Sequence, residues 1–150
     1  MELSLRGKNA VVCGSTRGIG LAVAKELSLL GARCILLARN EGRLQQVISL
    51  LPLPAQGKHE YRVADFSGNG QLHAAIESVV SENNIHILVN NSGGPASGPI
   101  TAATANDFES AFRQHLINNQ WLAQAVLPGM KKEKYGRIIN IISTSVKIPI

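Results

Sequence analysis

The segment Gly14-Ser-Thr-Arg-Gly18-Ile-Gly20 decides the fold, because its three glycines join an apolar strand to a helix. The short apolar run Asn9 to Cys13 predicts the strand, and the helix from Ile19 ends before Gly31. Its apolar residues recur at helical spacing: Ile19, Ala22, Val23, Leu27 and Leu30. Glycines permit a tight turn, and a helix start offers free N–H groups to a pyrophosphate. The segment favours dinucleotide binding, the alternative being a tight strand–helix turn without a ligand.

Outward from this segment, predicted strands alternate with predicted helices. Apolar runs predict further strands at 33–38, 61–64, 85–90 and 137–142. Helices are predicted at 41–51 and 71–83, and a long one, capped by Thr104-Ala-Asn-Asp107, to about Leu127. Strands that are nearly all apolar indicate a parallel sheet covered by helices on both faces. The expected fold class is α/β, a doubly wound parallel sheet, as one domain over 1–150.

Composition excludes several classes of protein. A chain of 150 residues with 45% hydrophobic and 17% charged residues suits one α/β domain. The run from Ile85 to Val89 is too short to span a membrane, and the start at Met1 lacks signal-peptide features, so we expect a cytoplasmic protein. Cys13 and Cys34 indicate small core residues rather than a disulfide framework. No histidine has metal-ligand spacing, and we expect no metal.

The net charge of +5 and the isoelectric point of about 9.6 raise the possibility of nucleic-acid binding. The basic residues are scattered, however, except for Lys131-Lys132-Glu133-Lys134 at a predicted helix end, where cations suit the helix dipole. No nucleic-acid motif accompanies the charge. We therefore expect the positive charge to suit an anionic cofactor and an acidic substrate carrier.

The glycine spacing Gly-x-x-x-Gly-x-Gly resembles that of the short-chain dehydrogenases/reductases, and further motifs follow in the family's order. Ala64-Asp65-Phe66 follows the third strand, and Asn90-Asn91-Ser92-Gly93 resembles the family's Asn-Asn-Ala-Gly, with serine for alanine. The stretch from Gly136 to Ser143 resembles the approach to the catalytic serine. The resemblance covers essentially all 150 residues and is closest to bacterial 3-oxoacyl-carrier-protein reductases. It implies a Rossmann-type fold with strand order 3-2-1-4-5 in this portion.

The end of the second strand bears on the choice of cofactor. Ala38-Arg39-Asn40 carries no acid there, whereas NAD enzymes place Asp or Glu at this point to accept the ribose hydroxyls. Arg39 and Arg17 can bind a 2′-phosphate, so we expect NADP(H), the alternative being two ordinary surface arginines. Together with the resemblance, this gives the expected cofactor-binding residues: Gly14, Ser15, Thr16, Arg17, Gly18, Ile19, Gly20, Arg39, Asp65, Phe66, Asn91, Ser92 and Gly93. The alternative for Asp65 is a turn cap, and for Asn91 a turn residue.

The resemblance implies hydride transfer between a nicotinamide and a carbonyl or alcohol. It assigns the substrate-binding serine to Ser143, with Thr144 and Ser145 as near alternatives. The family's tyrosine and lysine are expected roughly thirteen and seventeen residues later, beyond Ile150. We therefore expect a chain truncated at its C-terminal end and inactive by itself.

His115 departs from the family's pattern, which has asparagine in the long helix at this position. It is a candidate for a proton relay or a packed helix residue, and Asn118 or Asn119 lies one turn onward. The leading hypothesis is an NADPH-dependent reductase of a 3-oxoacyl thioester on acyl-carrier protein or CoA, or of a similar ketone. It would work as a homo-oligomer when full length. The alternative is a non-catalytic dinucleotide-binding protein that senses redox state or serves as a partner subunit.

Overall fold

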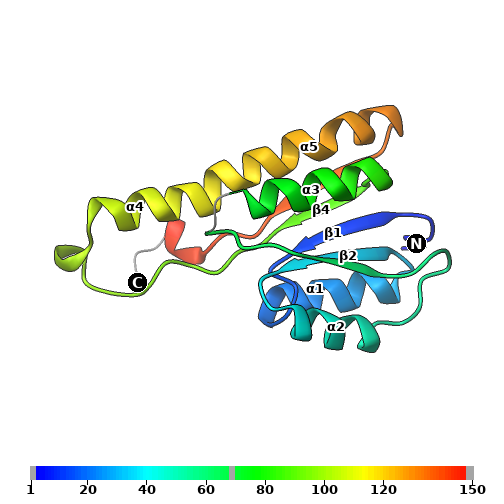
Figure 1. Cartoon of the computed structure of the whole chain (residues 1–150), viewed down its shortest axis with the longest axis horizontal. Helices are drawn as coiled ribbons and strands as arrows, with labels where there is room; N and C mark the ends of the chain where they lie inside the picture. Colours follow the sequence, from blue (N-terminus) through cyan, green and yellow to red (C-terminus); the bar gives the residue numbers. More distant parts are fainter. Residues whose placement is uncertain (1–2, 68–69, 148–150) are drawn as a thin grey trace.

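A computed structural model describes residues 3–67 and 70–147, and a parallel five-stranded sheet forms its centre (Figure 1). The strands are β1 (Asn9–Cys13), β2 (Arg33–Ala38), β3 (Glu60–Val63), β4 (Ile87–Asn90) and β5 (Arg137–Asn140). Their order is β3-β2-β1-β4-β5, and all four pairings are parallel. The predicted fold class and strand order are therefore confirmed.

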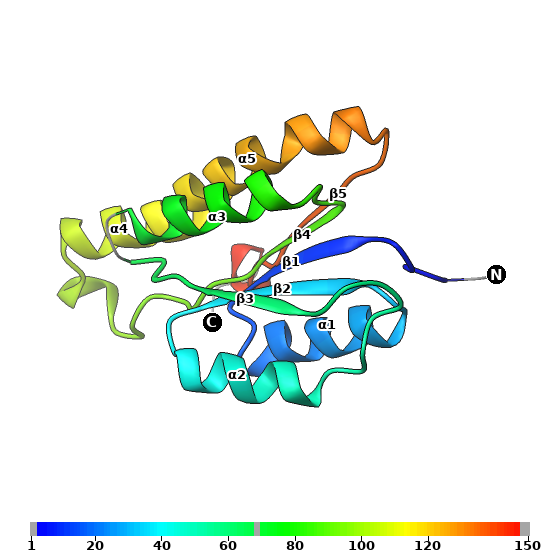
Figure 2. The same cartoon turned by 45° about the vertical axis from the view of Figure 1, so that its right-hand side comes forward.

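Helices cover both faces of this sheet (Figure 2). One face carries α1 (Gly18–Leu29) and α2 (Glu41–Leu50), and the other carries α3 (Gln71–Glu82) and α5 (Asn118–Lys132). α4 (Ala105–Phe112) continues the line of α5 past the end of the sheet. No helix in the described part of the chain is long and apolar enough to cross a membrane.

The strands divide the core into two layers because their side chains alternate between the faces. Val11 and Cys13 of β1 pack with α3 and α5, whereas Ala10 and Val12 pack with α1 and α2. Cys34 belongs to the second layer, and both cysteines are free and fully buried. Burial raises the pKa of each thiol to about 12, so both remain protonated. They are core residues, as predicted.

The predicted apolar series of α1 is confirmed in part. Val23 and Leu27 are half-buried and pack against the core, whereas Ile19 and Leu30 are exposed and the most deeply buried residues are small, namely Gly20, Ala24 and Ser28. A Cβ atom on Gly20 would lie only 2.2 Å from the carbonyl oxygen of Gly14. The start of the helix therefore approaches the turn too closely for a side chain at position 20.

The predicted long helix is interrupted. Thr104 caps α4 as predicted, in a capping box in which its hydroxyl accepts from the Asp107 N–H and its own N–H donates to the Asp107 carboxylate. A π-helical turn, Arg113–Ile117, then separates α4 from α5. Turns of this kind occur frequently at functional sites.

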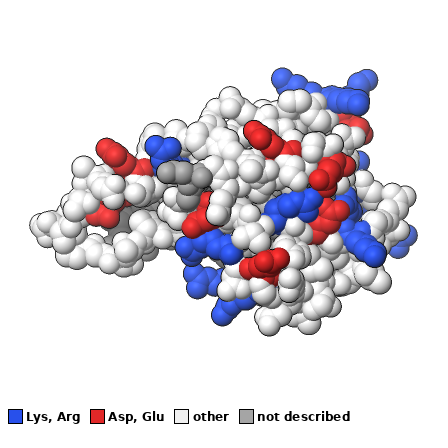
Figure 3. Space-filling view, viewed as in Figure 1, with Lys and Arg blue, Asp and Glu red and all other residues white. Residues whose placement is uncertain are grey.

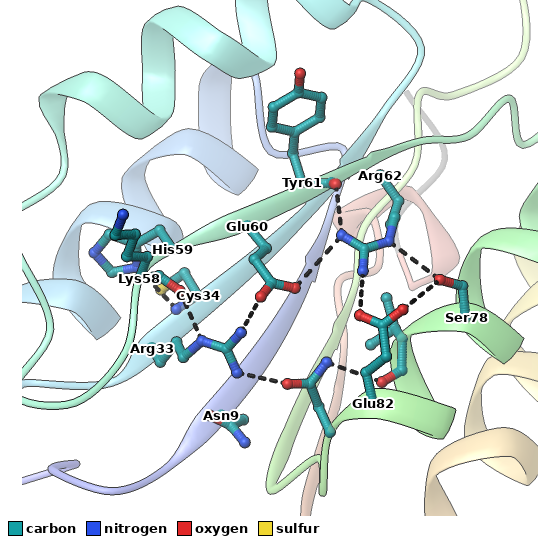
Figure 4. A network of polar contacts seen from close by, with 12 residues as sticks. Asn9, Arg33, Cys34, Lys58, His59, Glu60, Tyr61, Arg62, Ser78 and Glu82 are labelled. Atoms are coloured by element: carbon teal, nitrogen blue, oxygen red, sulfur yellow. Dashed lines mark hydrogen bonds and ion pairs between the residues drawn. The ribbon is translucent and has the colours of Figure 1, made fainter.

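A network of charged side chains ties the edge strand β3 to its neighbours (Figure 4). Glu60 pairs with Arg33 of β2 and with Arg62, whose guanidinium also contacts Glu82 of α3 at 2.8 Å. Arg33 and Glu60 open their strands, so this network includes the amino edge of the sheet. Its members are partly exposed, and each pair is worth at most about 1 kcal/mol.

Candidate functional site

The segments that follow the five strands meet at one edge, because all the strands run in the same direction. This carboxyl edge is where open α/β sheets bind ligands. It brings together the glycine turn 14–20 after β1, Arg39 after β2, Asp65 after β3, Asn91–Gly93 after β4 and Ser143 after β5.

The glycine turn has two tight positions and one open one. A Cβ atom on Gly14, whose φ is 58°, would lie 2.6 Å from the Asn91 carbonyl oxygen, and Gly20 is equally enclosed. Gly18 also has a positive φ, 54°, but no atom lies within 4 Å of the place its Cβ would occupy. The inner glycines thus let turn, helix and neighbouring loop close together. The open space at Gly18, where α1 begins, fits a pyrophosphate group.

The other residues of this turn divide between the interior and the surface. Ser15 is fully buried, and its hydroxyl donates to the Leu37 carbonyl oxygen at 3.4 Å. The Ser15 side chain therefore holds the turn against β2. Thr16 is half-buried, whereas Arg17 and Ile19 are exposed, with 57% of Ile19 accessible. An exposed isoleucine beside the open glycine offers an apolar surface to a bound ring or ribose.

Basic side chains gather where α1 and α2 begin (Figure 3). Three exposed arginines belong to these segments: Arg17 before α1, Arg39 after β2 and Arg43 in the first turn of α2. Asn40 caps α2 by accepting a hydrogen bond from the Arg43 N–H at 2.9 Å. Arginine side chains and two helix starts together favour an anionic group at this corner.

Asp65 takes part in a turn. Its Oδ1 accepts hydrogen bonds from the N–H and the hydroxyl of Ser67, at 2.9 and 2.7 Å. These bonds, with a smaller contribution from the charge of Arg39, lower the pKa of the Asp65 carboxyl. The turn-cap alternative is thus part of its role, and the ionised carboxylate also lies within electrostatic range of Arg39. The adenine contact stays a prediction.

Asparagines join the loop after β4 to the neighbouring strands. The Asn91 side chain donates to the carbonyl oxygens of Cys13 and Gly14, at 3.2 and 3.4 Å. Asn90 is buried and donates to the Asn140 side chain of β5 at 2.8 Å. Asn91 therefore braces the glycine turn, a role more specific than that of an ordinary turn residue.

His115 lies in the π-helical turn and reaches the same loop. Its Nδ1 is 3.0 Å from the Ser92 hydroxyl oxygen, and its Nε2 is buried without a hydrogen-bond partner in the described residues. Asn118 is buried and donates to the Phe66 carbonyl oxygen at 2.7 Å. The amide of Asn118 thus serves the loop after β3, and the ring of His115 contacts the loop after β4.

Ser143 follows β5 and is exposed at this edge, as is Thr144. Its carbonyl oxygen accepts a hydrogen bond from the Val146 N–H at 3.3 Å, which closes a 3₁₀ turn, Thr144–Val146. The strand–turn setting matches the one expected from the sequence. The part of Ser143 in chemistry stays a prediction.

Two hydrogen bonds at this edge were not predicted from the sequence. The bond from Asn118 to Phe66 fixes the loop after β3, and that from Asn90 to Asn140 joins two strand ends. A polar residue inside an apolar helix face was the available signal for Asn118. Asn90 and Asn140 are 50 positions apart and Asn118 and Phe66 are 52 apart, so no local sequence pattern identifies either pair.

Comparison with known proteins places this arrangement in a family. The short chain dehydrogenase family profile matches residues 8–150. The chain is 36% identical over 148 residues to the chloroplastic tropinone reductase homolog At2g29260 of Arabidopsis thaliana, covering 95% of this chain and 44% of that protein. It is 33% identical over 141 residues to the human inactive hydroxysteroid dehydrogenase-like protein 1, covering 93% and 43%. It thus spans less than half the length of these relatives.

Solved structures agree with this placement. The 3-oxoacyl (acyl-carrier-protein) reductase from Agrobacterium tumefaciens with NADP bound superposes with a TM-score of 0.85 at 30% identity, covering 99% of this chain and 57% of that one. The L-sorbose reductase from Gluconobacter frateurii, complexed with NADPH and L-sorbose, gives 0.89 at 28% identity, covering 100% and 57%. The shared sheet, the ordered motifs at its carboxyl edge and the profile match lead to one conclusion: this chain belongs to the short-chain dehydrogenase family.

Proposed function

We propose that the protein is an NADPH-dependent oxidoreductase that reduces a carbonyl substrate. The observation that carries the proposal is the carboxyl edge of the sheet. A glycine turn there leaves open space at Gly18 and carries the exposed Arg17, and the exposed Arg39 follows a second strand that ends without an acid. The NADP-bound and NADPH-bound relatives support the same cofactor.

The residues present fit this cofactor. The start of α1 at Gly18 would hold the pyrophosphate, and Arg17 and Arg39 would bind the 2′-phosphate. Asp65 would accept from the adenine amino group, and the loop Asn91–Gly93 would line the nicotinamide half. When bound, NADPH supplies a hydride to the substrate carbon. Ser143 would donate a hydrogen bond to the substrate oxygen, and His115 would hold a proton nearby.

The proposed substrate is a 3-oxoacyl thioester or a similar ketone. The named activity of the Agrobacterium relative supports this class, and the net charge of +5 suits an acidic carrier such as acyl-carrier protein. Exposed Phe108 and Phe112 on α4 support a homo-oligomer, since large apolar side chains seldom stay in water together. Two free, buried cysteines suit a reducing compartment such as the cytoplasm.

The test is a binding and turnover assay on the full-length protein that contains this chain. NADPH should bind more tightly than NADH, and a short 3-oxoacyl thioester should be reduced as NADPH absorbance falls. Ser143→Ala should lower turnover by about 10²-fold or more. Ser49→Ala, an exposed serine on α2, is the matched control and should leave turnover unchanged. Binding of neither cofactor would overturn the proposal.

The second candidate is a dinucleotide-binding protein without catalysis. The 33% identity to a human relative that is named as inactive supports this second candidate. Tight NADPH binding without turnover of ketones or 3-oxoacyl thioesters would select this candidate. Turnover that depends on Ser143 would exclude it.

A further inference from the structure

The end of β4 carries three consecutive polar residues, and each bonds to a different part of the molecule. Asn90 bonds to the end of β5, and Asn91 bonds to the end of β1 and to the glycine turn. Ser92 bonds to the π-helical turn between α4 and α5, where its hydroxyl oxygen lies 3.0 Å from His115 Nδ1. The chain is exposed beyond this point, from 93 to 100. Ser92 is therefore the last of three anchors before an exposed loop.

Ser92 and His115 both depart from the family's sequence pattern. Ser92 stands where the resemblance predicts alanine, and His115 where it predicts asparagine. Alanine has no hydrogen-bonding side chain, so this anchor exists because position 92 carries a hydroxyl. The two residues are 23 positions apart, and their contact is part-buried. A hydrogen-bonded pair accounts for both departures together.

Among the described residues, the His115 ring depends on Ser92 for its hydrogen bonding. The other ring nitrogen, Nε2, is buried and has no hydrogen-bond partner among residues 3–67 and 70–147. Loss of the Ser92 hydroxyl would leave both polar atoms of the ring unpaired, which is unfavourable in a part-buried setting. Because a hydroxyl both donates and accepts, the bond forms whichever ring nitrogen carries the proton. The bond therefore holds the ring and the loop together without requiring one protonation state.

The strand order divides the carboxyl edge into two sides about the glycine turn. β2 and β3 lie on one side of β1 and are followed by Arg39 and Asp65, the residues proposed for the adenosine half of the cofactor. β4 and β5 lie on the other side. With the pyrophosphate at Gly18, the nicotinamide half would extend toward the loop that Ser92 anchors. Asn91 braces the glycine turn through its own hydrogen bonds, so the adenosine side does not depend on Ser92.

We propose, on the basis of the function above, that Ser92 and His115 are positioning residues for the nicotinamide half of NADPH. Their hydrogen bond holds the start of the exposed loop against the long helix, so the loop is already ordered when the cofactor arrives. A loop that is ordered beforehand costs less free energy on binding. One hydrogen bond of this kind should contribute about three- to tenfold to NADPH affinity. A ligand that lacks the nicotinamide half should gain nothing from it.

Calorimetric titration of the full-length protein with two ligands tests this role. NADPH has both halves, whereas adenosine 2′,5′-bisphosphate keeps the 2′-phosphate and has no nicotinamide. Ser92→Ala and His115→Leu should each weaken NADPH binding about three- to tenfold and leave bisphosphate binding unchanged. Ser92→Thr keeps the hydroxyl, and His115→Asn keeps a polar atom near the position of Nδ1, so these conservative variants should retain most of the NADPH affinity. Equal weakening of both ligands, or unchanged NADPH affinity in Ser92→Ala, would overturn the proposal.

Control variants separate this role from a general loss of structure. Asn91→Ala loosens the glycine turn itself and should weaken the binding of both ligands. Ser49→Ala, on α2, should affect neither. When Ser92→Ala and His115→Leu are combined, the loss of NADPH affinity should be no greater than in the weaker-binding single variant, because both changes remove the same bond. Losses that multiply would contradict a hydrogen-bonded pair.

The same titrations distinguish a failure of this role from a failure of the proposed function. If the parent protein binds neither ligand, the proposed function fails and the positioning role fails with it. If the parent protein binds both ligands and the two single variants bind them equally well, the function stands and the positioning role alone is overturned.

Discussion

Asn91, at the end of the neighbouring strand, braces the glycine turn through two close contacts with Gly14. Its side-chain amide donates a hydrogen bond to the Gly14 carbonyl oxygen, and its own carbonyl oxygen lies 2.6 Å from the position that a Cβ atom on Gly14 would take. The same Gly14 oxygen would be 2.2 Å from a Cβ on Gly20. Turn, helix and loop therefore close on one another with no room for a methyl group. This packing fixes the edge at which the proposed cofactor would bind.

Gly20→Ala should destabilise the protein, because the added methyl group collides with backbone atoms that cannot move independently. The expected loss in free energy of unfolding is about 1–3 kcal/mol, measured by urea denaturation. Gly42→Ala on α2 is the control, since its Cβ would meet only the Asn40 side chain at 3.7 Å. The control should be neutral or slightly stabilising. Equal urea midpoints for the two variants would show that the turn is not tightly packed.

Arg39→Asp should weaken NADPH binding and reduce or invert the preference over NADH. The proposed bidentate contact with the 2′-phosphate is lost, and the new carboxylate repels that phosphate. The charge of Arg39 already acts at this edge, because it contributes to the lowered pKa of the Asp65 carboxyl. The expected cost is on the order of 1.5–3 kcal/mol, or roughly ten- to a hundredfold in affinity. Titration calorimetry with both cofactors measures it. Lys25→Asp, an exposed change on α1, should leave the ratio unchanged; equal affinities in the parent protein would rule out a phosphate site.

The sheet was predictable because its signal is local. Buried parallel strands are short apolar runs between turn residues, and β1 and β2 have the predicted bounds. Their order follows from the family resemblance, and the carboxyl edge follows from the order. The site's inventory of glycines, arginines and asparagines was therefore available from the sequence.

The contacts within the site were not predictable, because they join distant residues. Nothing near His115 in sequence indicates that its ring meets Ser92, and no local pattern predicts a π-helical turn inside an amphipathic helix. The small buried residues of α1 were not predicted, for a related reason. Helical spacing identifies where apolar residues recur, whereas the close approach of α1 to Gly14 requires a small residue at the start of the helix.

Asn118→Ala should loosen the loop after β3. The change leaves the Phe66 carbonyl without its 2.7 Å hydrogen bond from a buried amide, at a cost of about 1–3 kcal/mol in stability. Asn119→Ala, one residue onward and less buried, is the matched control and should cost less than about 0.5 kcal/mol. Urea denaturation compares the two, and hydrogen exchange at 64–67 should rise only in the first. Equal losses would mean that the bond to Phe66 contributes no stability.

The stability of the protein should fall in mild acid because of His86. Its Nδ1 accepts a hydrogen bond from the Asn9 N–H at 3.0 Å, and this bond requires an unprotonated nitrogen. Burial, and then the charge of Lys8, lower the pKa of His86 below its usual 6.5, although Glu133 opposes them. The unfolded chain therefore takes up this proton first.

The stability that His86 contributes is fully present above the unfolded pKa of about 6.5 and is lost as pH falls through the lower folded value. The carboxyls of Asp65 and Asp107 have pKa values lowered from 3.8, so their protonation acts only at more acidic pH. In the parent protein, the urea midpoint should be lower at about pH 5.5 than at about pH 7.5. His86→Asn places an amide oxygen near the position of Nδ1 and removes the titration, so its midpoints should differ less. An equal pH dependence in both proteins would show that another group is responsible.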